Sequence, residues 1–150
     1  IAIKHFLWET IASHYLELAK SRAYNQEGIF TKQEQESALF TLHYCLGNML
    51  KLLAPIIPFI THTVYKNMYT KDIHSEQFPL LPKITTTLKT ENIIEINSMI
   101  WKAKKEKNLP LKTEVLSLTL PITFKSLQKD LKATHKIKKI SFGKEIMISL

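Results

Sequence analysis

Residues 50–61 read LKLLAPIIPFIT, and this stretch predicts a corner between two consecutive helices. A residue that precedes proline disfavours helical geometry, so the helix that carries these leucines should stop around Ala54, before Pro55. Proline is tolerated in the first turn of a helix, so the next helix should begin at Pro58 and run to Tyr69. We therefore interpret the two prolines as part of the scaffold and not of a binding site.

The chain before this corner has the patterns of two helices. Residues 2–22 carry apolar side chains at three- and four-residue spacing, which predicts one helix with a buried stripe that includes Trp8 and Tyr15. Residues 31–34 read TKQE, the form of a capping box, so the helix before the corner should start there. Gly47 costs that helix about 1 kcal/mol relative to alanine, which indicates close packing at this position.

The pattern changes after the third helix. Residues 70–89 contain two prolines and three consecutive threonines, which predicts a long connection, and a fourth helix is expected over residues 91–107. Beyond it, apolar residues fall in short segments rich in β-branched side chains, with a short helix between them over residues 124–136. Gly143 and Lys144 have the spacing of the turn in a β-hairpin.

Together these patterns predict a mainly α fold. An antiparallel helix bundle is expected over residues 1–89, and a small α/β unit with a short antiparallel sheet is expected over residues 90–150. With 150 residues, of which 45% are hydrophobic, the chain is long enough to bury a core of its own.

The positive charge of the chain is concentrated in one segment. The net charge is +8, and residues 101–139 hold eleven lysines against three acidic residues, so the rest of the chain sums to zero. A concentrated cationic zone attracts polyanions through steering and counterion release, which makes nucleic acid the leading class of partner. The alternative is a lysine-rich surface that only keeps the protein in solution.

Several other functions lack the residues or the spacing that they require. Cys45 is the only cysteine, so neither an intrachain disulfide nor a cysteine-based zinc site can form. The six histidines do not have the spacing of a metal site, and three glycines cannot build a phosphate-binding loop. No local pattern places a nucleophile beside a base, so we expect no metal, no cofactor and no catalysis in this chain.

The sequence also gives expectations about location. The amino end lacks the charged and apolar regions of a signal peptide, and Lys51, Pro55 and Pro58 interrupt the apolar stretches well short of the roughly 20 residues of a membrane span. We expect a cytoplasmic protein without membrane contact. The start at Ile1, which is not a methionine, suggests a segment of a longer polypeptide.

Three blocks in the first 80 residues carry motifs. They read FLWE and HYLELAKSR at residues 6–9 and 14–22, ALFTL and LKLLAPIIPFIT at 38–42 and 50–61, and IHSEQFP at 73–79. In this order and at these intervals they resemble the anticodon-binding region of valyl-tRNA synthetases. The blocks are similar to that family's first helix with its tryptophan and basic pair, its second helix with the Pro-x-x-Pro entry to the third, and the Ser-Ile-His and Trp-Pro segment that follows.

The resemblance implies a helix bundle of the class Ia anticodon-binding type with tRNA as its partner. The His-Ile-Gly-His and Lys-Met-Ser-Lys-Ser motifs of class I catalysis are absent, so the catalytic domain and its ATP are expected in a missing part of the same polypeptide. We expect a monomer. His62 and Thr63 stand where the family usually has two glutamates, and Phe78 stands where it usually has tryptophan, so no family role is carried over to His62 or Phe78.

Two alternatives remain open. Isoleucyl- and leucyl-tRNA synthetases share this bundle, so the same region of one of those enzymes is possible. The other alternative is a helical protein-interaction module without a nucleic-acid role, whose lysines only solubilise it.

Eight polar side chains are the candidate tRNA contacts. Two lie at the expected end of the first helix, where a cation can bind phosphate or stack on an unpaired base, although Lys20 could instead pair with Glu17. Three lie around the end of the third helix, where the resemblance implies the anticodon loop, and three lie in the fourth helix, where the lysines are too spread to form one stripe. The eight are Lys20, Arg22, Lys66, Asn67, Lys71, Lys102, Lys104 and Lys105.

Overall fold

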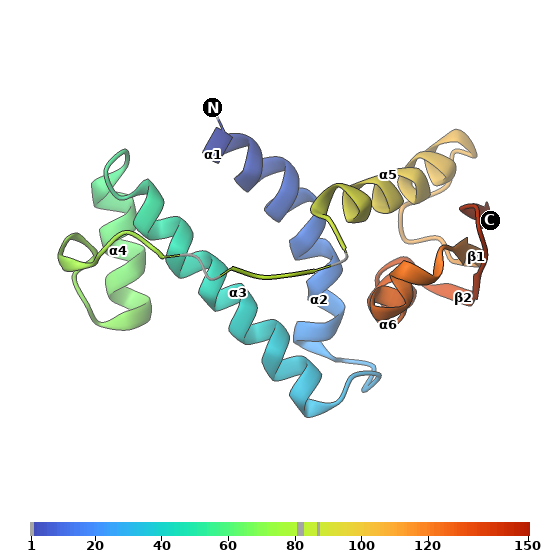
Figure 1. Ribbon diagram of the computed structural model, residues 1–150, viewed down its shortest axis with the longest axis horizontal. Coiled ribbons are helices and arrows are strands. Elements are labelled where there is room, and N and C mark those ends of the chain that lie inside the picture. Colours follow the sequence, from blue (N-terminus) through green and yellow to red (C-terminus); the bar gives the residue numbers. More distant parts are fainter. Residues whose placement is uncertain (1, 81–82, 87) are drawn as a thin grey trace. The chain divides into compact units, whose positions relative to one another are not determined.

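The computed structural model describes residues 2–80, 83–86 and 88–150 (Figure 1). The chain forms two compact units, one of Ile1–Gln35 with Thr85–Leu150 and the other of Glu36–Ile84. The structure confirms the predicted fold class, because helices predominate and the strands form one small sheet. The domain boundary expected between residues 89 and 90 stays a prediction. No helix in the described part of the chain is both long enough and apolar enough to cross a membrane.

The first unit begins with a continuous helical segment that changes geometry twice. Its parts are α1 (Ala2–His5), the π-helix η1 (Phe6–Tyr15) and α2 (Leu16–Tyr24). In η1 the backbone N–H of Leu16 donates to the carbonyl of Ile11, five residues back, which is the π-helical pattern. A π-helix has more residues per turn than an α-helix, so a stripe spaced for α-helical turns leaves the buried face.

The expected position of Trp8 in the core is therefore wrong. Its side chain is 69% exposed, whereas Leu18 and Ala19 of α2 are buried. The helix itself is confirmed, but α2 and not η1 carries its contribution to the core.

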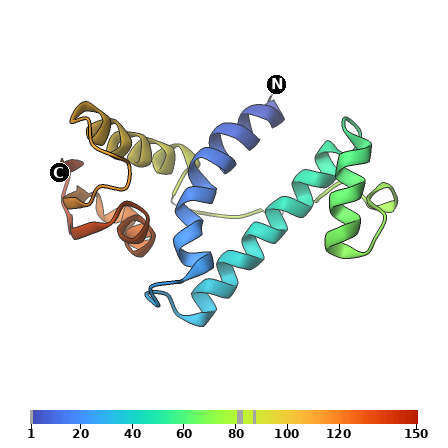
Figure 2. The same ribbon diagram turned by 180° about the vertical axis from the view of Figure 1, so that it is seen from behind.

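The rest of the first unit packs helices against a three-stranded sheet. Its elements are α5 (Thr90–Glu106), β1 (Val115–Leu120), η3 (Ile122–Leu127), α6 (Gln128–His135), β2 (Ile137–Phe142) and β3 (Met147–Ser149). Helix α6 lies against α2, as Figures 1 and 2 both show. Buried side chains from α2, α5, α6 and the strands β1 and β2 form one core, with Ile100, Leu118 and Leu120 fully enclosed.

The predicted β-hairpin around Gly143 is wrong. The strand order is β2-β1-β3, with β1 parallel to β2 and antiparallel to β3, so the sheet is mixed and β2 does not pair with β3. The crossover through α6 returns β2 parallel to β1, as such a helical connection does. The N–H of Gly143 then donates to the carbonyl of Leu120 at 2.9 Å, and the chain passes to the other edge of β1.

The second unit contains the predicted corner. Helix α3 (Lys32–Leu53) begins in the first unit and continues into the second, where α4 (Pro58–Tyr69) and the short 3-10 helix η2 (Ile73–Ser75) follow. The capping box is confirmed, because the N–H of Thr31 donates to the Glu34 carboxylate at 2.8 Å and the N–H of Glu34 donates to the Thr31 hydroxyl at 3.2 Å.

A small apolar core holds the second unit together. It consists of Leu50, Ala54, Tyr65 and Ile73, with partly buried side chains of α3 and α4 packed around it. A Cβ atom placed on Gly47 would lie 3.1 Å from the hydroxyl oxygen of Tyr69, which confirms the close packing expected there. Pro82 and Thr87 of the expected connection lie outside the described residues, and the described residues between η2 and α5 form no helix or strand.

Candidate nucleic-acid interface

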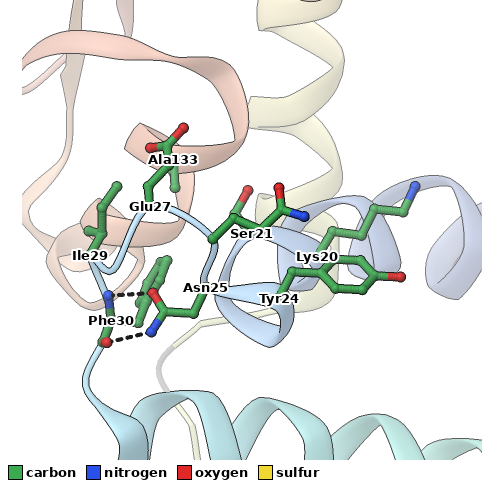
Figure 3. Close-up of a pocket in the computed structure, with 9 residues that line it drawn as sticks. Lys20, Ser21, Tyr24, Asn25, Glu27, Ile29, Phe30 and Ala133 are labelled. Atoms are coloured by element: carbon green, nitrogen blue, oxygen red, sulfur yellow. Dashed lines mark hydrogen bonds between the residues drawn. The ribbon is translucent and has the colours of Figure 1, made fainter.

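The loop that follows α2 is held in shape by one asparagine. Asn25 adopts the left-handed conformation (φ 45°), which asparagine tolerates better than most residues, and so ends α2. Its side-chain oxygen accepts from the N–H of Phe30 at 3.0 Å, and its side-chain nitrogen donates to the carbonyl of Phe30 at 2.7 Å (Figure 3). The ring of Phe30 is buried. The two ends of the loop, Asn25 and Phe30, are thus joined by hydrogen bonds, and one of them is anchored in the protein.

This loop, α2 and α6 line a small cavity that is open to solvent. Its volume is about 170 Å³, below the roughly 300–1,000 Å³ typical of sites for larger ligands. The ring of Tyr24 stands at its edge and is 71% exposed. Figure 3 shows Lys20 and Tyr24 on one side of the cavity and Glu27 and Ile29 on the other. The lining residues are Lys20, Ser21, Tyr24, Asn25, Gln26, Glu27, Ile29, Phe30 and Ala133.

A larger groove adjoins the cavity and shares Glu27, Ile29 and Ala133 with it. We call it the α6 groove. Its volume is about 670 Å³, and four exposed lysines of α6 and the start of β2 line it. These lysines are Lys129, Lys132, Lys136 and Lys138.

Two of the four groove lysines are paired with carboxylates. Lys129 contacts Glu34 at 2.9 Å, and this hydrogen bond is the main reason that the pKa of Glu34 falls to about 2. Lys138 contacts Glu114 at 3.0 Å and lowers the pKa of that carboxyl group. Within the described residues, Lys132 and Lys136 form no ion pair, so their charges are available to an external anion.

Sequence reasoning counted these lysines in the basic segment but did not select them as site residues. The available signal was the run of lysines at positions 129, 132, 136 and 138 beside a predicted helix and strand. What it could not show is that α6 packs against α2 and so brings these lysines beside the loop after Tyr24.

The two cations predicted at the end of the first helix have different surroundings. Lys20 lies at the rim of the cavity and also forms an ion pair with Glu17. Its position therefore fits both a contact with a ligand and a pairing within the helix. Arg22 forms a two-pronged hydrogen-bonded ion pair with Asp130 of α6, whose carboxylate is buried. The guanidinium also lies 5.6 Å from the ring centroid of Phe30. Arg22 therefore joins α2 to α6, and its charge is balanced within the protein.

Lys104, which was predicted as a tRNA contact, is not accessible to a ligand. Its side chain is fully buried, and its Nζ donates to the carbonyl of Leu111 at 2.8 Å. Burial, together with the charge of Lys136, lowers the pKa of this lysine. The reason was visible in the sequence, because Ile96, Ile100 and Lys104 follow at four-residue spacing and so share the buried face of α5.

The remaining predicted contacts are exposed. Lys102 and Lys105 lie on the solvent side of α5, and Lys102 is 4.0 Å from Glu106. In the second unit, Lys66, Asn67 and Lys71 gather around the end of α4, where the left-handed Thr70 (φ 55°) terminates the helix. Their role in binding stays a prediction.

Comparison with known proteins places this geometry in context. A family model described as the anticodon-binding domain of tRNA ligase matches residues 1–120. The valine–tRNA ligase of Pyrobaculum aerophilum is 37% identical over 148 residues, covering 95% of this chain and 18% of that protein. Those of Aeropyrum pernix and Ehrlichia canis are 35% and 36% identical, covering 89% and 87% of this chain and 17% of each relative. The chain thus spans less than a fifth of the length of these relatives.

Proposed function

We propose that this chain, which belongs to the anticodon-binding domain family of tRNA ligases, holds the anticodon stem-loop of a tRNA against the α6 groove and the adjoining cavity. The observation that carries this assignment is the presence of two cations without an ion pair in the described chain, Lys132 and Lys136, in a groove that continues into a cavity edged by an exposed aromatic ring. Phosphates and an unpaired base are the two parts of an RNA loop that such an arrangement suits.

The groove and the cavity have different tasks in this proposal. Lysines neutralise phosphates, release counterions and so supply affinity without sequence information. Sequence is read where an unpaired base stacks on an aromatic side chain and presents its edge to polar groups. Tyr24 offers the stacking surface, and Gln26 and Glu27 offer a donor and acceptors at the cavity. Asn25 is already bonded to Phe30 and acts as support.

Further contacts are proposed at the other exposed candidates. Lys20, Lys102 and Lys105 extend the positive charge of the first unit, and Lys66, Asn67 and Lys71 offer a second cluster in the second unit. Lys104 and Arg22 support the fold, because one is buried and the other is bonded to Asp130.

The relatives give the proposal its substrate. They carry the name valine–tRNA ligase, so we propose valine tRNA as the ligand and place aminoacylation in a catalytic domain of the same polypeptide outside this chain. ATP is consumed at that domain. Binding here orients the tRNA, and this chain makes no bond itself. We propose a cytoplasmic monomer for the whole enzyme.

The test is a mobility-shift titration of the 150-residue chain with valine tRNA and with the same tRNA carrying an altered anticodon. Affinity should fall for the altered tRNA and should decrease with added salt for both. A Tyr24→Ala variant should bind more weakly and should lose most of the preference between the two tRNAs. Equal affinity for both tRNAs in the unaltered protein would remove the assignment of anticodon recognition.

A further inference from the structure

Helix α4 and the turn that follows it bring three potential metal ligands together in the second unit. His62 lies on α4. Asp72 lies at the start of η2, and His74 lies within η2. One ligand atom from each residue lies within 4.8 Å of the other two. Local spacing did not reveal the cluster, because nine residues separate His62 from Asp72 and the left-handed Thr70 ends the helix between them.

The chemistry of the three side chains suits a divalent transition metal. Two imidazoles and one carboxylate are ligands that zinc and its neighbours in the first transition row accept. Zinc binds such atoms at about 2.0–2.2 Å, which places tetrahedral ligand atoms roughly 3.3–3.6 Å from one another. His62 Nδ1 and Asp72 Oδ1 are already 3.1 Å apart, and only modest movement is needed to bring in the third ligand.

The two histidine rings stack on each other at the surface of the second unit. They lie parallel, with an interplanar angle of 3° and centroids 5.5 Å apart. The side chain of His62 is 34% exposed and His74 is exposed, so an ion can approach both rings from solvent. Coordination of one ion by both rings requires that each ring direct a nitrogen atom at it.

Asp72 is held in a fixed position between the two histidines. Its carboxylate accepts from the backbone N–H of His74 at 2.9 Å, and its carbonyl accepts from the hydroxyl of Ser75 at 2.8 Å. The next residue, Ile73, is buried in the core of this unit and anchors the turn. The backbone N–H of His74 and, to a smaller extent, the ring of His62 hold the pKa of Asp72 below its usual range, so the carboxylate is charged at neutral pH.

We propose that His62, Asp72 and His74 form a binding site for one divalent transition-metal ion, of which Zn²⁺ is the suitable probe. The ion links α4 to the η2 turn and closes the chain between residues 62 and 74 into a loop. Water occupies the remaining coordination positions, because the cluster is open to solvent. The enclosed segment carries Lys66, Asn67 and Lys71, so the ion also restrains these side chains.

The experiment is a calorimetric titration of the metal-free 150-residue chain with ZnCl2, repeated with CoCl2 to record the absorption of the bound cobalt ion. The ligand variants are His62→Gln, His74→Gln and Asp72→Asn. The last keeps an oxygen that can accept from the N–H of His74, so it removes the charge and retains the turn. The matched control is His43→Gln, an exposed histidine of α3 in the same unit and outside the cluster.

The unaltered chain and His43→Gln should bind one equivalent of Zn²⁺, and each ligand variant should bind it at least about tenfold more weakly. Zn²⁺ should raise the melting temperature of the first two proteins and should not raise that of His62→Gln. Circular dichroism checks that every variant is folded. The proposal is overturned if the unaltered chain shows no saturable binding of one ion, or if His62→Gln and His74→Gln bind as tightly as His43→Gln.

Discussion

The two compact units of the chain combine charge and packing in different ways. In the first unit, α2, α5, α6 and the strands enclose a core in which Ile100, Leu118 and Leu120 are fully buried, and the basic groove is built on the outside of that core. The second unit has a smaller core around Tyr65, and its polar candidates lie on a helix end and a short turn. The basic groove thus accompanies the larger core, and the polar candidates of the second unit accompany the smaller one.

The largest expected effect tests the difference between the two cores. Leu118→Ala removes a fully enclosed side chain from the central strand and should lower the free energy of unfolding by about 4 kcal/mol. Leu50→Ala, at 7% exposure in the smaller core, should cost about 2–3 kcal/mol. Urea denaturation of the two variants and of the unaltered chain measures both changes in the free energy of unfolding.

The aromatic residues allow the two units to be followed separately. Both tryptophans, Trp8 and Trp101, belong to the first unit, so tryptophan fluorescence reports that unit and far-ultraviolet circular dichroism reports both. Leu118→Ala should shift the unfolding transition seen by tryptophan fluorescence. Leu50→Ala should leave that transition in place and shift mainly the part of the dichroism transition that belongs to the second unit. If both variants shift both signals equally, the two units unfold as one, and their stabilities cannot be compared separately.

Acid should weaken the first unit before the second. Burial, aided by the charge of Lys104, lowers the pKa of His135 from 6.5 to about 4, and burial also lowers the pKa of His14. Between pH 6.5 and about pH 4, the unfolded chain binds a proton at His135 that the folded chain does not bind. The contribution of His135 to stability is therefore fully present above about pH 6.5 and is lost as the pH falls towards 4. The loss attributable to His135 is roughly 3 kcal/mol at most.

Urea denaturation at about pH 7 and about pH 4.5, followed by tryptophan fluorescence, measures this loss. In the second unit, the ion pair with Lys51 lowers the pKa of Glu76, so its contribution disappears only as the pH falls below 4.5. His135→Gln should reduce the dependence between these pH values to the part that His14 contributes, and His43→Gln should leave it unchanged. A pH dependence of undiminished size in His135→Gln would contradict the assignment.

One ion pair between separate elements can be compared in each unit, Arg22 with Asp130 and Lys51 with Glu76, and the burial of the two pairs differs. Arg22→Gln leaves the Asp130 carboxylate, 4% exposed, without its partner and should cost about 2 kcal/mol. Lys51→Gln leaves Glu76, 24% exposed, to be solvated and should cost about 1 kcal/mol or less. Urea titrations of the two variants give the comparison, and an equal cost would show that burial does not separate these pairs.

The sequence predicted the helices of this chain better than it predicted its contacts. The corner at Pro55 and Pro58 and the capping box at Thr31 are local, because each depends on backbone geometry within a few residues. The position of Trp8 was missed because a π-helix alters the period on which the stripe was counted. The pairing of β2 depends on the crossover through α6, which spacing around Gly143 does not encode.

The candidate site shows the same limit. Lys20 was selected from a local feature, the end of a helix, and it lies at the rim of the cavity, while its role in binding stays a prediction. Lys104 is buried, although its four-residue spacing from Ile100 was visible in the sequence. The α6 groove and the cluster around His62 are each formed by segments that only the fold brings together. Residues that act through a shared surface are therefore predicted less well than residues that shape one element.

The smallest expected effect decides which unit supplies phosphate contacts. The double variant Lys132→Ala with Lys136→Ala removes two cations of the α6 groove that no described carboxylate pairs. It should weaken the proposed binding of valine tRNA about fivefold. The slope of log affinity against log salt should fall by about 0.7–0.9 for each phosphate that the variant no longer neutralises. The matched double variant Lys66→Ala with Lys71→Ala removes the same charge from the second unit and should have a smaller effect, roughly twofold, because these two exposed lysines lie on a helix end and do not line the α6 groove.

Mobility-shift titrations at three salt concentrations measure both quantities for both variants. Because each double variant removes two exposed lysines, a difference between them cannot come from net charge alone and must come from position. An equal fall in affinity and in salt slope would place phosphates on both units. An effect confined to the Lys66 and Lys71 variant would show that the phosphates contact the end of α4. The lysines of the α6 groove would then only keep the protein in solution, which is the alternative that the charge pattern of the sequence leaves open.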